Sequence, residues 1–303
     1  MQAMILAAGL GSRMQPLTHF IPKPLFPVLN TPSIERILRS LIESGFSHIY
    51  INLFHLAQCI LSVLHDWTHA SSINIIPVVE PFLLGTGGAL VNASPYFLKD
   101  SPLILVNADV VCDIDFRRFW EDHVASGAVA TLLVHNKTPY NNLDVSNGLL
   151  VGFESKRADA LAYTGIACFS PAFFHFLPSE MPCSLIDGLK NALARGVAIR
   201  AMSLTDFSKN DIWEDIGTLE GYLAAHRQLL VSDGRLFYRG DGCRLALGVR
   251  LEEWVCLGNE VVVEENTIIR RSVVWSGSHI PPNELIEDSV VSKFGILKWK
   301  PSN

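Results

Sequence analysis

The sequence predicts an α/β fold in which a doubly wound, mainly parallel sheet precedes a short parallel β-helix. From residue 3 to about residue 80, apolar runs typical of buried strands alternate with segments of helical periodicity. Such alternation indicates a mainly parallel sheet covered by helices on both faces. After about residue 233, apolar residues recur every six positions, which is the period of a parallel β-helix. We therefore expect two domains, at residues 1–232 and 233–303.

The first predicted elements are a buried strand at residues 4–8 and a helix that starts near residue 33. The strand is an apolar run too short for the hydrophobic core of a signal peptide. In the helix, apolar residues follow the pattern i, i+3, i+4, i+7 that buries one helix face. They are Ile34, Ile37, Leu38 and Leu41. Thr31 or Ser33 can cap the start of this helix, and Gly45 can end it.

Three further segments continue the alternation, with an apolar run at 48–54, a helical segment at 57–67 and an apolar run at 73–79. A later apolar run, 103–106, predicts a central strand that ends at the polar sequence 107–109. In open α/β sheets, ligands bind at the carboxyl ends of such strands. We therefore expect a ligand site at this point.

The six-residue period of the C-terminal part starts at Cys256. Counting by six gives only apolar residues, namely Cys256, Val262, Ile268, Val274, Ile280 and Ile286. Chance alternation in a set of antiparallel hairpins is the alternative. With three hexads per coil, the repeat forms little more than two coils, so the main domain or a second subunit must cover an end. We expect a homo-oligomer, a dimer or larger.

Composition and charge limit the classes of function. The net charge of −6, without a stretch rich in Lys and Arg, argues against a protein that coats nucleic acid. The six cysteines have neither a CxxC pair nor a spacing with histidine that suits zinc. No signal peptide is recognised, so we expect reduced thiols and a cytoplasmic protein with neither a nucleic-acid nor a membrane partner.

Two glycines follow the first predicted strand and predict a phosphate-binding turn. A dinucleotide-binding fingerprint would need a third glycine where Met14 stands, and a P-loop would need a lysine after Gly11, where Ser12 and Arg13 stand. What remains is a strand-to-helix turn in which Gly9 and Gly11 let the backbone approach a ligand and Arg13 adds a permanent charge. An ordinary tight turn is the alternative for the glycines alone.

Lys23 stands between Pro22 and Pro24. The two prolines restrict the backbone around the lysine, so its ammonium group is held in place. Arg13 and Lys23, converging on one glycine turn, would form a cradle for a triphosphate. Taken alone, Lys23 could equally be a solvated surface charge.

The combination of GxGxRMxPLT (residues 9–18) with PKPLxPV (residues 22–28) resembles the sugar-phosphate nucleotidyltransferases, from Met4 to about Leu230. These enzymes make nucleotide sugars from a nucleoside triphosphate and a sugar 1-phosphate. Members like the mannose-1-phosphate guanylyltransferases carry a hexapeptide tail as well. The resemblance implies a Rossmann-like fold of the nucleotide-diphospho-sugar transferase type with a left-handed β-helix. It also implies the nucleotide-binding residues Ala7, Ala8, Gly9, Gly11, Arg13, Lys23, Glu80, Gly85, Thr86, Gly87 and Asn107.

Two aspartates match the metal ligands of this family, Asp109 in "NAD" and Asp215 in "WEDIGTLEGYLAAH". An aspartate at a strand end is otherwise more often a helix cap. The resemblance implies Mg²⁺ as the cofactor, with catalysis by Arg13, Lys23, Asp109 and Asp215. In the implied reaction, a sugar 1-phosphate oxygen attacks the α-phosphorus in line and pyrophosphate leaves. The nucleophile is already an anion, so no general base is needed, and catalysis comes from positioning and charge neutralisation.

The segment "YTGIACFSP" resembles the lining of the family's sugar pocket, with Thr164 and Gly165 nearest the substrate. We expect Asp109 to contact the substrate as well. The family's Glu-Lys-Pro motif is altered in "GFESKR", because Ser155 separates Glu154 from Lys156 and Arg157 replaces the proline. We expect Lys156 to bind the sugar phosphate and Glu154 to bind the substrate, and an exposed turn is the alternative for Lys156.

Glu80 lies five residues before Gly85, where relatives contact the edge of the base. Guanine presents two neighbouring donors that one carboxylate can accept, whereas uracil presents one donor between acceptors. This favours GTP, with mannose or heptose as the sugar. The alternatives are a uridylyl-, thymidylyl- or cytidylyltransferase on another phosphorylated sugar or alcohol, and a silent regulatory homologue that binds a nucleotide sugar.

Overall fold

The computed structural model describes residues 1–70 and 73–299, and the chain forms two compact units. The first unit comprises residues 1–9 and 37–211, and the second comprises residues 10–36 and 212–303. α1 (Ser33–Glu43) and β13 (Ser208–Asp215) each cross from one unit into the other. We describe each unit by itself.

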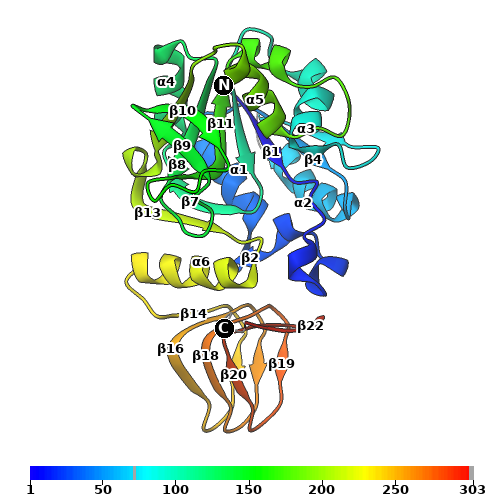
Figure 1. Ribbon diagram of the computed structural model, residues 1–303. Helices are drawn as coiled ribbons and strands as arrows, with labels where there is room; N and C mark the ends of the chain where they lie inside the picture. The colour runs from blue at the N-terminus through cyan, green and yellow to red at the C-terminus, as the bar shows by residue number, and fades with distance from the viewer. Residues whose placement is uncertain (71–72, 300–303) are drawn as a thin grey trace. The chain divides into compact units, whose positions relative to one another are not determined.

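The first unit contains a nine-stranded sheet in the order β5-β4-β1-β6-β11-β8-β12-β10-β9. Figure 1 labels several of these strands, namely β1, β4, β8, β9, β10 and β11. Its strands are β1 (Gln2–Leu6), β4 (His48–Leu53), β5 (Asn74–Val79), β6 (Leu103–Asn107), β8 (Ala130–His135), β9 (Leu143–Ser146), β10 (Leu149–Phe153), β11 (Ala162–Phe169) and β12 (Ile199–Ser203). β11 and β10 run antiparallel to the other seven strands. The predicted mainly parallel sheet is therefore confirmed.

Helices alternate with the first parallel strands, as the sequence predicts. The helices of this unit beside α1 are α2 (Ala57–Ala70), α3 (Gly85–Ala93), α4 (Phe116–Ser126) and α5 (Leu185–Ala194), with 3-10 turns at Ser94–Tyr96, Pro171–Phe176 and Leu204–Asp206. A further strand, β7 (Val110–Ile114), pairs with β13, and here the Asn210 amide donates to Asp113 Oδ2 at 2.7 Å. Among the described residues, none of these helices is long and apolar enough to cross a membrane.

The predicted elements differ from the observed ones mainly at their ends. β1 ends at Leu6, so Ala7 and Ala8 already belong to the following loop. α1 begins at Ser33 and ends at Glu43, just before Gly45, whose φ is +90°. The four apolar residues that predict α1 are all at most 5% exposed, so this helix forms because its one apolar face is buried.

The second unit contains α6 (Leu219–Ser232) and a stack of parallel β-coils. The coil strands are β14 (Phe237–Arg239), β15 (Arg244–Leu245), β16 (Arg250–Leu257), β17 (Val262–Val263), β18 (Ile268–Val274), β19 (His279–Ile280), β20 (Leu285–Glu287), β21 (Ser289–Ser292) and β22 (Gly295–Lys298). Its N-terminal part has β2 (Pro27–Val28), β3 (Thr31–Pro32) and 3-10 turns at Ser12–Met14, Leu17–His19 and Lys23–Leu25.

Residues that pair between successive coils of this unit are 18 residues apart in the first pair of coils and 17 residues apart in the next. Arg244 pairs with Val262, and Val262 pairs with His279. Eighteen residues are three hexads, so one repeat is one coil of a β-helix. The second unit also contains residues 10–36 and 212–232, which precede the expected boundary of the β-helix domain. A division of the chain at residue 232 stays a prediction.

The buried interior of the coils does not follow a single six-residue column throughout. It includes Leu257, Val263 and Ile269, one position after the column counted from Cys256, and then Val274, Ile280 and Ile286 of that column. The step from Ile269 to Val274 is therefore five residues long. The pairing of β16 with β18 shifts register between Glu252 and Val255, which a count of apolar residues does not reveal.

Corners of successive coils share a left-handed backbone conformation. Residues with positive φ recur at equivalent positions, namely Gly242, Glu260 and Gly277, then Gly248, Asn266 and Asn283, and finally Glu253, Arg271 and Asp288. Non-glycine residues in this conformation cost about 1 kcal/mol or more each. The coils must supply contacts that compensate for this cost.

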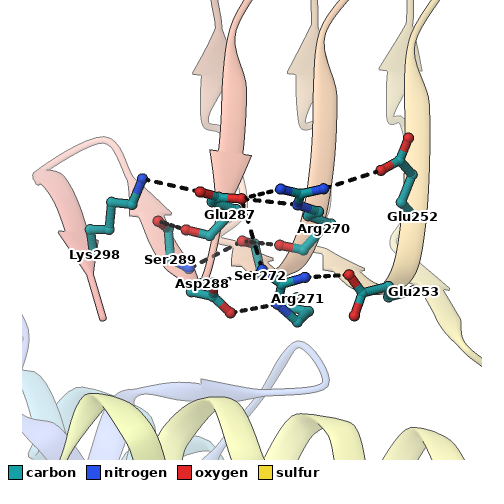
Figure 2. A network of polar contacts seen from close by, with 9 residues as sticks. All are labelled: Glu252, Glu253, Arg270, Arg271, Ser272, Glu287, Asp288, Ser289 and Lys298. Atoms are coloured by element: carbon teal, nitrogen blue, oxygen red, sulfur yellow. Dashed lines mark hydrogen bonds and ion pairs between the residues drawn. The ribbon is translucent and has the colours of Figure 1, made fainter. Parts of the chain in front are cut away.

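Charged side chains supply such contacts at the third corner (Figure 2). Arg271 Nε donates to Asp288 Oδ1 at 2.7 Å, and Arg271 also pairs with Glu253 on the preceding coil. Glu253, Arg271 and Asp288 thus form one row of charges across the coils. In a second row, one residue earlier in each coil, Arg270 Nε donates to Glu287 Oε2 at 2.9 Å. These hydrogen bonds lower the pKa of Asp288 and the pKa of Glu287 below their ordinary values. We call the two rows, formed by Glu252, Glu253, Arg270, Arg271, Glu287, Asp288 and Lys298, the charge ladder.

α6 packs against the coils through aromatic residues. Trp275 Nε1 donates to Tyr222 Oη at 2.9 Å, and both side chains are buried. The Phe26 ring meets the Trp275 ring edge-on at 4.9 Å between centroids. Burial of such aromatic pairs contributes about 1 kcal/mol beyond the area they remove from water. One flank of the coil stack is therefore covered within its own unit.

Candidate active site

The first unit has a cavity at the carboxyl ends of its central parallel strands. Leu6 at the end of β1 is aligned with Asn107 at the end of β6 and with Asn52 near the end of β4. The connections from β1 and β6 leave toward opposite sides of this point in the strand order, which makes it a topological switch point. The cavity here measures about 210 Å³ and is lined by Leu6, Ala8, Gly9, Asn52, Glu80, Leu83, Gly85, Thr86, Asn107 and Asp109.

Seven of the predicted site residues line this cavity together. They are Ala8, Gly9, Glu80, Gly85, Thr86, Asn107 and Asp109. Ala7 lies next to them, and its amide donates to Asn52 Oδ1 at 2.8 Å. Gly87 is not part of the lining, since its amide donates to the Cys183 carbonyl at 3.0 Å. The tertiary structure thus collects residues from four separate stretches of the chain.

The glycine-rich segment of α3 packs against residues 183–185, a contact that the sequence did not predict. Gly85 has φ +76°, and a Cβ there would overlap the carbonyl oxygen of Cys183. The Thr86 hydroxyl accepts a hydrogen bond from the Leu185 amide at 2.8 Å, at the start of α5. Close approach of the protein's own backbone is therefore one reason for a glycine here. Gly85 and Thr86 nevertheless remain on the cavity wall.

Glu80 is 3% exposed and accepts hydrogen bonds at both carboxylate oxygens. Asn52 Nδ2 donates to Oε1 at 2.7 Å, and the Leu84 amide donates to Oε2 at 3.1 Å. Asn52 is a cavity residue that the sequence analysis missed. Its position at the carboxyl end of a predicted parallel strand was the available signal.

Of the two predicted sugar-pocket residues in β11, Gly165 lies beside the cavity. Its φ is +79°, and a Cβ there would lie 2.7 Å from Nδ2 of Asn107, which lines the cavity. The pairing of β11 with β8 shifts register between Tyr163 and Ala167, around this glycine. Thr164 is fully buried, and its hydroxyl donates to the Leu133 carbonyl at 2.8 Å. Thr164 therefore holds the two strands together.

Glu154 and Lys156 follow β10 and are both exposed. Neither is among the residues that line the cavity. Glu154 pairs with Lys190 of α5 at 3.1 Å, and the Lys190 ammonium also lies 5.7 Å from the centre of the Phe153 ring. Lys190 is a second lysine in this region that the motif comparison missed, because it lies on a separate helix.

The second unit brings four further predicted residues together. Gly11, with φ +64°, is the N-cap of the 3-10 turn Ser12–Met14, which carries Arg13. Lys23 begins the 3-10 turn Lys23–Leu25, and Pro22 and Pro24 flank it as predicted. A Cβ at Gly217 would lie 2.7 Å from Arg13 Nη2 and 2.9 Å from Lys23 Nζ.

Asp215 completes this cluster. Its Oδ2 lies 3.7 Å from Arg13 Nη2, and its Oδ1 accepts from the Gly217 amide at 2.6 Å. The Arg13 side chain is 59% exposed and the Asp215 side chain 20% exposed. Two cations and one carboxylate leave a net positive charge, which suits a phosphate ligand.

Within the described residues, no three His, Cys, Asp or Glu side chains gather in a way that could hold a metal ion. Asp109 belongs to the first unit and Asp215 to the second. Mg²⁺ does not require such a cluster, because it binds one or two carboxylates and completes its shell with phosphate oxygens and water. Each aspartate by itself is therefore a chemically suitable ligand for Mg²⁺.

Comparison with known proteins identifies the family. The model of the family described as Nucleotidyl transferase matches residues 2–232. The chain belongs to this family. The prediction of a sugar-phosphate nucleotidyltransferase, made from the glycine turn and the Lys23 segment, is therefore confirmed.

Relatives of this nucleotidyl transferase differ in the nucleotide that their names give. The UTP--glucose-1-phosphate uridylyltransferase of Synechocystis is 32% identical, and the alignment covers 96% of this chain and 87% of that protein. Mannose-1-phosphate guanyltransferase beta-A of Xenopus laevis is 27% identical over 74% of this chain, which spans 63% of that protein.

Solved structures support the fold of the nucleotidyl transferase. The crystal structure of HddC from Yersinia pseudotuberculosis, complexed with GMP-PN, matches with a TM-score of 0.62. It is 22% identical, and the match covers 75% of this chain and 99% of that chain. At this identity, the likeness shows the fold alone.

Proposed function

We propose that this nucleotidyl transferase joins a nucleoside triphosphate to a sugar 1-phosphate. A phosphate oxygen of the sugar 1-phosphate bonds to the α-phosphorus, the bond from that phosphorus to the bridging oxygen breaks, and pyrophosphate leaves. The observation that carries the proposal is the cavity at the switch point, where Gly9, Thr86 and Asp109 face the same space. In folds of this class, nucleotides bind at that point.

The cation cluster of the second unit is proposed to bind the triphosphate. Arg13 and Lys23 both reach the Gly217 position, so two positive charges are available to one anion. They would neutralise the charge that develops on the departing pyrophosphate, which is the usual contribution of such cations to phosphoryl and nucleotidyl transfer. Gly11 lets the backbone of this turn pack closely against Thr18 and Lys23.

We propose Mg²⁺ as the cofactor, with Asp109 and Asp215 as its carboxylate ligands. When bound, the ion supplies positive charge to phosphate oxygens and favours the in-line geometry. Asp109 would also contact the sugar phosphate. The Gly217 amide, which donates to Asp215 Oδ1, orients this carboxylate.

For the sugar 1-phosphate we propose a site next to Asn107. Gly165 supplies a backbone without a side chain there, and Thr164 holds the strand that carries it. Lys156 is proposed to bind the phosphate, and Glu154 the substrate, from the loop after β10. If the nucleotide is GTP, we propose that the second substrate is the 1-phosphate of mannose or of heptose.

For the base, guanine is our first candidate, because the carboxylate of Glu80 lines the cavity and matches the two donors on the guanine edge. Uracil is a second candidate, and a specific observation favours it. Both oxygens of Glu80 already accept hydrogen bonds from Asn52 and Leu84, which leaves less acceptor capacity for guanine. The relative that aligns with 96% of this chain is named a uridylyltransferase.

We further propose a cytoplasmic homo-oligomer, a dimer or larger. The basis is the short coil stack, which needs cover at its ends. A monomer in light scattering would contradict it.

A pyrophosphate-release assay with Mg²⁺ tests the function. GTP, UTP, dTTP, CTP and ATP are each combined with the 1-phosphates of mannose, glucose, heptose, N-acetylglucosamine and N-acetylmuramate. We expect release from one pairing above all others, and that pairing names the base and the sugar. Absence of release from every pairing, in folded protein, would contradict the enzyme and favour the silent regulatory homologue.

A further inference from the structure

A chain of buried hydrogen bonds connects two walls of the cavity. It runs from the Ala7 amide to Asn52 Oδ1 at 2.8 Å, from Asn52 Nδ2 to Glu80 Oε1 at 2.7 Å, and from the Leu84 amide to Glu80 Oε2 at 3.1 Å. Asn52 is 4% exposed and Glu80 is 3% exposed. The chain therefore links the loop after β1 to the loop before α3 with almost no access to water.

Neither loop is held by sheet pairing at these positions, although the Leu84 carbonyl also accepts from the Cys183 amide at 3.0 Å. Ala7 follows the last residue of β1, and Leu84 precedes the first residue of α3. Their neighbours Ala8, Gly9, Leu83 and Gly85 line the cavity. The link therefore couples the positions of these lining residues from the two loops.

We propose that Asn52 and Glu80 are positioning residues that set the spacing of the two nucleotide-binding loops. This inference rests on the proposed function, because it takes the cavity to be the nucleotide site. It changes the role of Glu80 from reading the base edge to holding the loop 83–85. It also assigns a role to Asn52, which no motif indicates.

The direction of the hydrogen bonds makes a specific test available. In E80Q, the introduced side-chain amide has only one acceptor oxygen for the two donors of Asn52 and Leu84, so one buried donor loses its partner. In N52D, two carboxylates face each other and repel. We expect each single variant to raise the KM for the nucleoside triphosphate about tenfold, since an unpaired or repelling buried group disturbs the spacing of the two loops.

The double variant N52D/E80Q restores every hydrogen bond with one direction reversed. The carboxylate introduced at position 52 accepts from the Ala7 amide with one oxygen and from the side-chain amide nitrogen introduced at position 80 with the other. The side-chain amide oxygen at position 80 accepts from the Leu84 amide. The exchange conserves shape and net charge, so the double variant is a matched control for both single variants.

Two measurements test the inference, steady-state kinetics and hydrogen exchange at the Ala7 and Leu84 amides. We expect faster exchange at the Leu84 amide in E80Q and at both amides in N52A. In N52D/E80Q, exchange and KM should return to within about threefold of wild type, with the base preference unchanged. A double variant that remains as impaired as the single variants, or that prefers another base, would overturn the inference and return Glu80 to base reading.

Failure of the proposed function gives a different result. If wild-type protein releases no pyrophosphate with any substrate pair, the function fails, whereas the exchange measurement still reports on the link. Normal protection of both amides in E80Q and N52A would overturn the link itself, whatever the activity.

Discussion

In the second unit, Nη2 of Arg13 lies 3.7 Å from Oδ2 of Asp215, and both side chains flank Gly217. The arginine comes from the glycine turn and the aspartate from the end of β13. The pair is partly exposed, so it contributes little to the free energy of unfolding. Its importance is that the cation proposed to bind phosphate and the carboxylate proposed to bind a metal ion lie within one cluster.

Replacement of the aspartates tests the metal assignment. We expect Asp215→Asn and Asp109→Asn each to lower Mg²⁺-dependent kcat by about a hundredfold or more, because loss of a ligand removes several kcal/mol of charge stabilisation. Circular dichroism and thermal unfolding should match wild type, since each change conserves shape. Asp233→Asn, a change at an exposed residue after α6, is the control. Full activity in both variants would remove the assignment.

Removal of the lysine tests the triphosphate cradle. Lys23→Ala should lower kcat/KM for the nucleoside triphosphate by about a hundredfold or more, the usual effect of losing one charge-stabilising donor. The KM for the sugar 1-phosphate should change less. Lys209→Ala removes an exposed lysine of β13 and should leave both constants unchanged. Activity of K23A within a few-fold of wild type would contradict the cradle.

Gly127 and Gly165 both have a positive φ but differ in their surroundings. Replacing each by alanine tests the close approach of Gly165 to Asn107. Gly127→Ala meets open space at φ +65°, so it should cost only the conformational penalty of about 1 kcal/mol. Gly165→Ala has the same conformational cost at φ +79°, and its Cβ would also lie 2.7 Å from Nδ2 of Asn107. We expect a lower melting temperature for G165A than for G127A, and a raised KM for substrate in G165A alone. Equal behaviour of the two variants in both assays would contradict this account of the wall.

The charge ladder predicts a pH-dependent contribution to stability. Hydrogen bonds from Arg271 lower the pKa of Asp288 below its unfolded value of 3.8. A lowered folded pKa stabilises the protein above the unfolded value, and this stabilisation is lost as the pH falls through the folded pKa. Arg271→Met should therefore reduce stability by about 1 kcal/mol or less near pH 7. This deficit should shrink below about pH 4 as the carboxyl becomes protonated.

Thermal unfolding of wild type and R271M between pH 3 and pH 7 measures this dependence. High salt should reduce the difference at pH 7, because the paired groups are partly exposed and screened. Arg250→Met, at a more exposed arginine of β16, is the comparison. A difference between wild type and R271M that stays constant across the pH range would contradict the role of Asp288.

Local patterns in the sequence predict the elements whose cause is local. The apolar face of α1 is visible in four residues, and the prolines around Lys23 hold its backbone as predicted. The glycine turn followed by an arginine indicates the family, because backbone amides and a guanidinium are what a phosphate requires. The six-residue period reveals the coils, since each hexad forms one side.

Only the tertiary structure decides which of these residues meet. Asn107 reaches Gly165, Gly85 meets Cys183, and Asn52 binds Glu80, all through contacts between segments far apart in the chain. Such contacts depend on strand order and register, which a single residue's type does not encode. The same reason explains the shifted column in the β-helix, where a change of register between coils moves the buried position by one residue.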